Sequence, residues 1–147
     1  ILQTFAFCQS EDVYRSLPLL HEDEEIFRRF DRAAVFPGCD VVSMTRVEKE
    51  MCTQKELLNY IYSHLRYPEE ARKKKISGQV VIEFVIAYDG TIRNVELLRG
   101  FDRACDNAVI KVIEDMNDLD DLWTPAVLDN EYVSTYYTMP IGFKALK

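Results

Sequence analysis

The chain has 147 residues, which suffices for one domain with a tail or for one enlarged domain. Its residues are 48% hydrophobic, enough for a real core, and its formal net charge of -7 argues against a nucleic-acid partner. No apolar run in the sequence approaches the roughly 18 residues that a membrane-spanning helix needs.

The N-terminal residues are first apolar and then acidic. Residues 1–9 read as the end of a signal peptide, although an ordinary apolar strand or an arbitrary boundary fits equally well. Residues 10–52 form an acidic extension, in which Ile26, Phe27 and Phe30 follow a charge run and predict a short helix. We therefore divide the chain into a possible signal-peptide remnant at 1–9, an extension at 10–52 and a folded domain at 53–147.

The four cysteines fit neither a CxxC motif nor a Cys/His zinc pattern. Cys39 and Cys52 flank a short polar segment and could form a disulfide in an oxidising compartment, which the sequence leaves undecided. Cys105 lies on the apolar face of a predicted helix, where a small core residue is expected. We expect no metal site and no cofactor.

Two helices are predicted before the first long strand. Thr53 and Glu56 have the spacing of a capping box, and apolar residues follow at helical spacing, which predicts a helix over residues 53–65. Tyr67-Pro68 ends that helix and begins another, because proline suits the first helical position. We expect this second helix to end at Gly78, after which a strand begins.

Residues 79–99 predict a β-hairpin around Asp89-Gly90, which is a type I′ turn sequence. A two-residue loop there would pair Ile86 with Arg93 and Ile82 with Leu97. In this register one face of the hairpin is apolar and should meet the core, and it consists of Val80, Ile82, Phe84, Ile86, Val95 and Leu97. The opposite face is partly wet.

The last third of the chain predicts a helix, a loop and a strand. Residues 102–116 carry one apolar stripe, which should cover the hydrophobic face of the sheet, and Asp102 suits the N-cap. An acidic loop follows, and residues 123–126 should anchor it against the core. The final strand is predicted at about residues 131–139, where β-branched and aromatic residues gather, and Pro140 suits an edge strand or its end.

These features resemble the TonB C-terminal domain family. The matching residues follow one another in the family's order over roughly the last 80 residues, and the most distinctive are Tyr67, Pro68, Gly78, Asp89, Gly90, Trp123 and Pro125. The resemblance implies an α+β fold with a three-stranded antiparallel sheet and two helices on one face, here with an N-terminal helical extension. It also implies a periplasmic module in transport across the outer membrane.

The resemblance assigns binding to the last strand. In the family, the N-terminal peptide of a TonB-dependent outer-membrane receptor adds beside this strand, so that main-chain hydrogen bonds give affinity. The corresponding site residues are Tyr132, Val133, Ser134, Thr135, Tyr136, Tyr137 and Thr138. Whether the N-terminal extension covers this strand is left open.

No catalytic pattern appears in the sequence, so neither an enzyme nor a small-molecule substrate is predicted. Energy-transducing members of the family carry a transmembrane helix and a Pro-rich linker, and the sequence shows neither. We expect either that an anchor was cut away or that the protein is a secreted, unanchored relative. The alternative function is an unanchored interaction protein of the cell envelope, including a homodimer paired through the same edge, without energy transduction.

Overall fold

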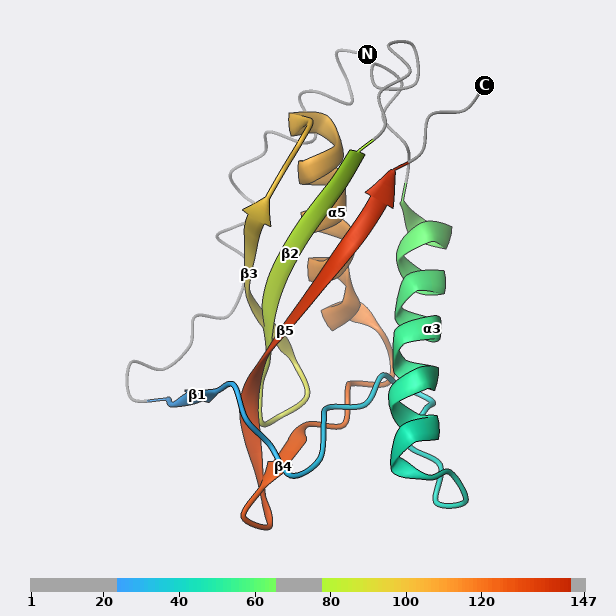
Figure 1. Cartoon of the computed structure of the whole chain (residues 1–147), viewed down its shortest axis with the longest axis vertical. Helices are drawn as coiled ribbons and strands as arrows, with labels where there is room; N and C mark the ends of the chain where they lie inside the picture. The colour runs from blue at the N-terminus through green and yellow to red at the C-terminus, as the bar shows by residue number, and fades with distance from the viewer. Residues whose placement is uncertain (1–23, 66–77, 144–147) are drawn as a thin grey trace.

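The computed structural model describes residues 24–65 and 78–143 (Figure 1). Three antiparallel strands form the centre of the sheet in the order β3-β2-β5: β2 (Gly78–Ile86), β3 (Ile92–Arg99) and β5 (Glu131–Phe143). Helix α5 (Arg103–Glu114) lies behind this sheet, and α3 (Arg46–His64) approaches β5 at the C-terminal ends of both elements and diverges from it below. The α+β fold that the resemblance implied is therefore confirmed.

Two short strands extend the sheet around β5. β1 (Ile26–Phe27) pairs with β5 in parallel, on the side away from β2. β4 (Ala126–Leu128) forms a tight antiparallel hairpin with the start of β5, and both residues of its turn, Asp129 and Asn130, have positive φ. The short helix predicted around residues 26–30 is wrong, because this segment gains its hydrogen bonds from the sheet instead.

The β2–β3 hairpin differs from its predicted register near the turn. Gly90 has φ +86° and the amide of Ala87 donates to the carbonyl of Thr91, so the loop holds three residues rather than two. Ile86 consequently pairs with Ile92 and not with Arg93. A bulge at Asn94, whose φ is +48°, then inserts one residue in β3 and restores the predicted pairing of Ile82 with Leu97.

Helix α3 begins earlier than predicted. Thr45 is its N-cap and makes the reciprocal capping box with Glu48, so the predicted start at Thr53 is wrong. Thr53 is instead a buried residue within the helix, where its hydroxyl accepts a hydrogen bond from the amide of Phe36 at 3.1 Å. The predicted boundary between residues 52 and 53 thus falls inside a helix.

Cys39 and Cys52 form a disulfide with a Cα–Cα distance of 5.8 Å, which decides the question that the sequence left open. The bond attaches the turn at Gly38 to α3 and closes a short loop. Residues 34–36 on one side of it are buried in the core, and they bring the N-terminal segment against Trp123 through the ring of Phe36. Part of the predicted extension is therefore integral to the domain.

The core lies between the sheet and the two helices. Asp102 caps α5 as predicted, and its carboxylate accepts from the amide of Cys105, which is fully buried. The apolar face of β2 packs on α5, and Trp123 fills the space between Phe84 and Tyr137. A 3-10 turn, η1 (Asp115–Asp118), follows α5. The predicted helix after Tyr67-Pro68 and the predicted signal-peptide remnant lie outside the described residues.

Candidate functional site

The side of β5 away from β2 is occupied over only part of its length. Ser134 and Thr135 pair there with β1, and residues 131–133 pair with β4 in the hairpin that begins β5. On the β2 side, residues 135–143 form a continuous ladder. Within the part of the chain that the structure describes, no strand pairs with residues 136–142 on the side away from β2. We call this stretch the open edge.

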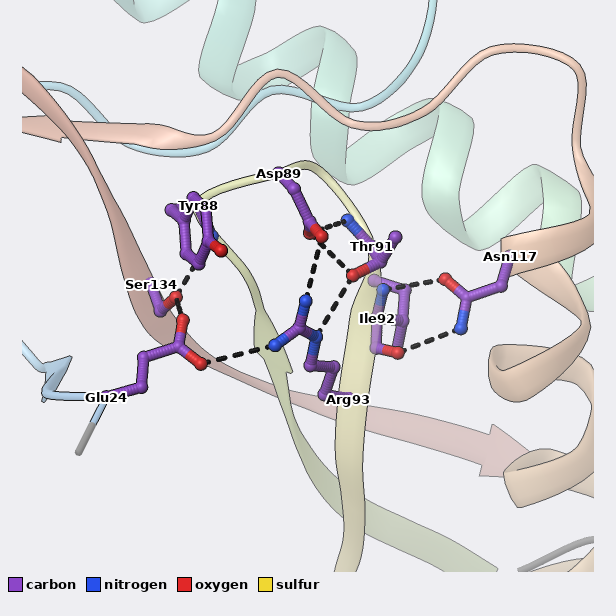
Figure 2. Close-up of polar contacts among 8 residues, drawn as sticks. All are labelled: Glu24, Tyr88, Asp89, Thr91, Ile92, Arg93, Asn117 and Ser134. Carbon is purple, nitrogen blue, oxygen red and sulfur yellow. Dashed lines mark hydrogen bonds and ion pairs between the residues drawn. The ribbon is translucent and has the colours of Figure 1, made fainter. Parts of the chain in front are cut away.

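A buried polar cluster holds the N-terminal segment against the hairpin turn, as Figure 2 shows. The guanidinium of Arg93 donates to the carboxylate of Glu24 at 3.2 Å and to that of Asp89 at 2.8 Å. The hydroxyl of Ser134 donates to Glu24 and accepts from the amide of Tyr88. Because Arg93 and Glu24 are both buried, removal of either would leave the other charge uncompensated.

Asp89 has two roles in this cluster. Its carboxylate accepts from the amide and hydroxyl of Thr91, which shapes the turn, and it also pairs with Arg93. Burial by itself would raise the pKa of Asp89, but these hydrogen bonds and the positive charge of Arg93 outweigh burial and lower the pKa. On the other side of the hairpin, the side-chain amide of Asn117 accepts a hydrogen bond from the backbone amide of Ile92 and donates one to the Ile92 carbonyl.

A second contact ties the N-terminal segment to the outer face of the sheet. The guanidinium of Arg28 lies 4.1 Å from the ring centroid of Tyr136 and donates to the carboxylate of Glu83 at 3.1 Å. Thr138 donates to the same carboxylate at 2.8 Å. The hydrogen bond from Arg28 lowers the pKa of Glu83 although burial opposes it, so Glu83 is held ionised beside the open edge.

The backbone of the open edge meets α3 at its far end. The hydroxyl of Tyr62 donates to the carbonyl of Gly142 at 3.0 Å. Alternate residues of a strand present their backbone groups to the same side, so Tyr136, Thr138 and Pro140 also turn theirs toward this edge. Pro140 has no amide hydrogen, which leaves one gap in the row of donors.

The predicted site residues are thus divided between two environments. Tyr132 is exposed, Val133 is partly buried against the core, and Ser134 and Thr135 are buried under β1. Tyr137 turns inward, where its ring stacks on Phe84 and burial raises its pKa. From residue 136 onward no described strand pairs with the side away from β2, and Thr138, Pro140 and Gly142 are exposed there.

The residues that carry the family resemblance lie at turns and strand starts, where they shape the backbone of the domain. Gly78 opens β2 against the ring of Phe101. Gly90 leaves no room for a Cβ because the carbonyl of Trp123 lies against it, and the amide of Trp123 donates to the Gly90 carbonyl at 3.2 Å. Pro125 lies just before β4, at the point where Thr124 bonds the backbone of Val35. Tyr67 and Pro68 lie outside the described residues.

Sequence reasoning missed Glu24, Arg28 and Tyr62, which border the site. Each is ordinary in the sequence, and only the pairing of β1 with β5 and the position of α3 give them a role. Among residues 24–65 and 78–143, no three His, Cys, Asp or Glu side chains gather in a group that could hold a metal ion. The open edge itself presents main-chain hydrogen-bonding groups beside Tyr136 and the ion pair of Arg28 and Glu83.

The family model described as Gram-negative bacterial TonB protein C-terminal matches residues 63–145, more than half of the chain. The chain belongs to the TonB C-terminal family. Domains of this family are non-enzymatic protein-interaction domains of the periplasm and cell envelope. They generally interact with outer-membrane receptors. Within the described residues, no helix has the length and apolar character to cross a membrane.

Two solved structures of the TonB C-terminal domain of Helicobacter pylori are similar to this chain. The structure of residues 179–285 has 17% identity and a TM-score of 0.50, covering 72% of this chain and 88% of that one. The structure of residues 194–285 has 22% identity and a TM-score of 0.48, covering 62% and 91% respectively. The structure of residues 179–285 supports a shared fold at low sequence identity. Among curated proteins, no sequence matches this chain significantly.

Proposed function

We propose that this chain is a periplasmic, non-catalytic TonB module that binds the N-terminal peptide of a TonB-dependent outer-membrane receptor by β-strand addition. The observation that carries the proposal is the open edge, where a row of backbone groups has no strand partner among the described residues. A peptide strand satisfies such a row without requiring particular side chains. Family membership supplies the class of partner.

The length of the open edge suits a short peptide. Residues 136–142 span about 20 Å at roughly 3.3 Å per residue, which matches a strand of ordinary length. β1 already occupies Ser134 and Thr135 on this side of β5, so a peptide that extends farther toward the start of the strand must displace β1. We therefore place the receptor peptide beside residues 136–142 rather than along the whole predicted strand.

The same geometry supports a second candidate, an unanchored envelope interaction protein that pairs with a second copy of itself. What favours it is the pairing of Ser134 and Thr135 with β1, which shortens the edge left for a receptor. Self-association at the open edge would bury the same backbone groups. The two candidates differ in whether the edge responds to a peptide or to protein concentration.

The experiment is a titration of isotope-labelled protein with a synthetic peptide from the N-terminus of a TonB-dependent receptor of the same organism, followed through backbone amide NMR shifts. We expect the largest shifts at Tyr136, Thr138 and Gly142. The matched control is the same peptide N-methylated at alternate residues, in two versions. One version should lose binding, because its methyl groups replace the donors that face β5.

The results separate the candidates. Absence of shifts at the open edge with millimolar peptide would contradict receptor binding. Sedimentation that shows a concentration-dependent dimer, with no peptide response, would support the self-paired envelope protein.

A further inference from the structure

The N-terminal segment has two halves, which the domain holds by different means. Residues 31–36 exchange backbone hydrogen bonds with Val127 and Thr124, and residues 34–36 are buried in the core. Among the described residues of the core, none comes from residues 24–28, which we call the strap. Residues 31–36 are therefore integral to the domain, whereas the strap is attached to its surface.

The strap lies on the same side of β5 as the open edge and directly continues it. Ile26 and Phe27 pair in parallel with Ser134 and Thr135, and the open edge begins at the next residue, Tyr136. Both strap residues are only partly buried. Because two residue pairs make a far shorter ladder than an ordinary strand, side-chain contacts must hold the strap in place.

Two polar contacts hold the strap, one near each end. At its start, the buried carboxylate of Glu24 accepts from Arg93 beside the hairpin turn (Figure 2). At its end, Arg28 donates to Glu83 and lies over the ring of Tyr136. The side chain of Arg28 is 68% exposed, so this second contact can open without unpacking the core.

The chain passes from the strap toward β4 through two exposed residues, Arg29 and Phe30. Asp31 follows, and its carboxylate accepts from the amide of Asp129 in the β4–β5 turn at 2.9 Å. Figure 1 shows this path from β1 past β5 to β4. The strap can therefore leave β5 by rotation about Arg29 and Phe30 while residues 31–36 stay in place.

We infer that the strap is an autoinhibitory strand, which swings off β5 before a long receptor peptide can pair with Ser134 and Thr135. The inference rests on the proposed function and adds its regulation. A closed strap leaves residues 136–142 to the peptide, and an open strap extends the same edge by the two residues that β1 had covered. The strap and the peptide therefore compete for one short stretch of backbone.

The strength of this competition depends on the tether and on the side-chain contacts. Because the strap is part of the chain, it competes at an effective concentration that dilution does not lower. The apparent affinity for a long peptide falls by the fraction of molecules in which the strap is open. When Arg28 leaves, Glu83 retains the hydrogen bond from Thr138. Weakening the Arg28 contact should therefore raise the affinity for a long peptide, whereas loss of a mere support would lower it.

The test titrates the disulfide-bonded, isotope-labelled chain with two pairs of peptides. One pair comes from the N-terminus of the receptor, and the other is designed, with threonine alternating with lysine. Each pair has a short member of about seven residues, which matches residues 136–142, and a long member of about twelve, at roughly 3.3 Å per residue. Backbone amide shifts report where each peptide binds.

Three forms of the protein are compared with the wild type. Arg28→Gln weakens the strap without altering the backbone of β5, and its matched control is Arg46→Gln, which breaks an exposed ion pair with Glu50 on α3. A locked form carries Ile26→Cys and Ser134→Cys, which are partners in the parallel pair. Adjacent strands lie about 4.8 Å apart, within the Cα–Cα range of a disulfide. The two single cysteine variants are the controls for the lock.

Arg28→Gln should bind the long peptides about fivefold more tightly than the wild type and the short peptides equally, because an exposed ion pair with a cation–π contact is of modest strength. Without peptide, exchange of the Ser134 amide, which faces β1, should also be about fivefold faster. Arg46→Gln should change neither quantity. The locked form should bind the long and short members of each pair equally, and every variant should keep an intact amide spectrum.

The outcomes separate the inference from the proposed function. Binding of the short receptor peptide at the open edge, with long-peptide affinity and Ser134 exchange equal in wild type and Arg28→Gln, would overturn the inference and leave receptor binding intact. Weaker binding of the long peptides to a folded Arg28→Gln would also overturn the inference. Strap-dependent binding of the designed peptides alone would support the inference and overturn the proposed function. Failure of all four peptides would overturn both.

Discussion

Replacement of Glu114 by glutamine should stabilise the protein in a pH-dependent way. Glu114 is the last residue of α5, it is 7% exposed, and neither carboxylate oxygen has a hydrogen-bond partner among the described residues. Burial, together with the charge of Asp115, raises its pKa to about 7, although Lys111 opposes this. The C-terminal end of a helix dipole disfavours a negative charge as well.

The magnitude follows from linkage between ionisation and folding. The pKa of Glu114 rises from 4.5 in the unfolded chain to about 7 in the fold, so the folded protein binds the proton more tightly. The resulting penalty develops as the pH rises from below 4.5 and levels off above 7. At about 1.4 kcal/mol per pKa unit, it amounts to about 0.8 kcal/mol at pH 5 and about 3.3 kcal/mol at pH 8.

The assay is urea unfolding of the wild type and of Glu114→Gln at pH 5 and pH 8. Glutamine keeps the shape of the side chain and cannot ionise, so the advantage of the variant should grow by about 2.5 kcal/mol between the two pH values. Glu56→Gln is the control, because Glu56 is exposed on α3. The reasoning is refuted if the difference between wild type and Glu114→Gln is the same at both pH values.

Two further predictions concern the backbone. Gly90→Ala should destabilise the protein by about 2–4 kcal/mol in urea unfolding, because φ is +86° and the carbonyl of Trp123 occupies the place of a Cβ; Gly38→Ala, also at positive φ but with nothing within 4 Å, should cost only about 1 kcal/mol. Equal losses in the two variants would mean that the contact with Trp123 has no energetic weight. Replacement of Cys39 and Cys52 by serine should cost about 3 kcal/mol, from a loop with a sequence separation of 13. A reductant should lower wild-type stability by a similar amount and leave the double variant unchanged, and insensitivity of the wild type would count against this estimate.

Local sequence patterns predicted the elements that depend on near neighbours. The chain turns at Asp89-Gly90 as predicted, although through a three-residue loop rather than a two-residue type I′ turn. The apolar face of β2 and the cap at Asp102 are also present, because strand alternation and helix capping act over a few residues. The predicted register near the turn was wrong, because the loop holds three residues rather than two. The bulge at Asn94 then restores the predicted pairing farther along the strands, and such a bulge has no strong local pattern.

Two capping boxes compete in the sequence, one beginning at Thr45 and the other at Thr53, each with glutamate three residues later. The fold uses the first, because the disulfide and the buried amide of Phe36 place Thr53 inside the domain. Local propensity cannot distinguish the two boxes. The choice depends on partners that are distant in the sequence.

The sequence by itself determined the family, the α+β class and the strand on which binding is expected, because these follow from local patterns arranged in a characteristic order. Only the tertiary structure decided how much of that strand is open. Two residues of β1, held by Glu24 and Arg28, cover Ser134 and Thr135, while α3 reaches the strand at its far end, where Tyr62 bonds Gly142. The physical reason is that a pairing of two residues carries no periodicity, and its energy comes from side chains more than 50 residues away.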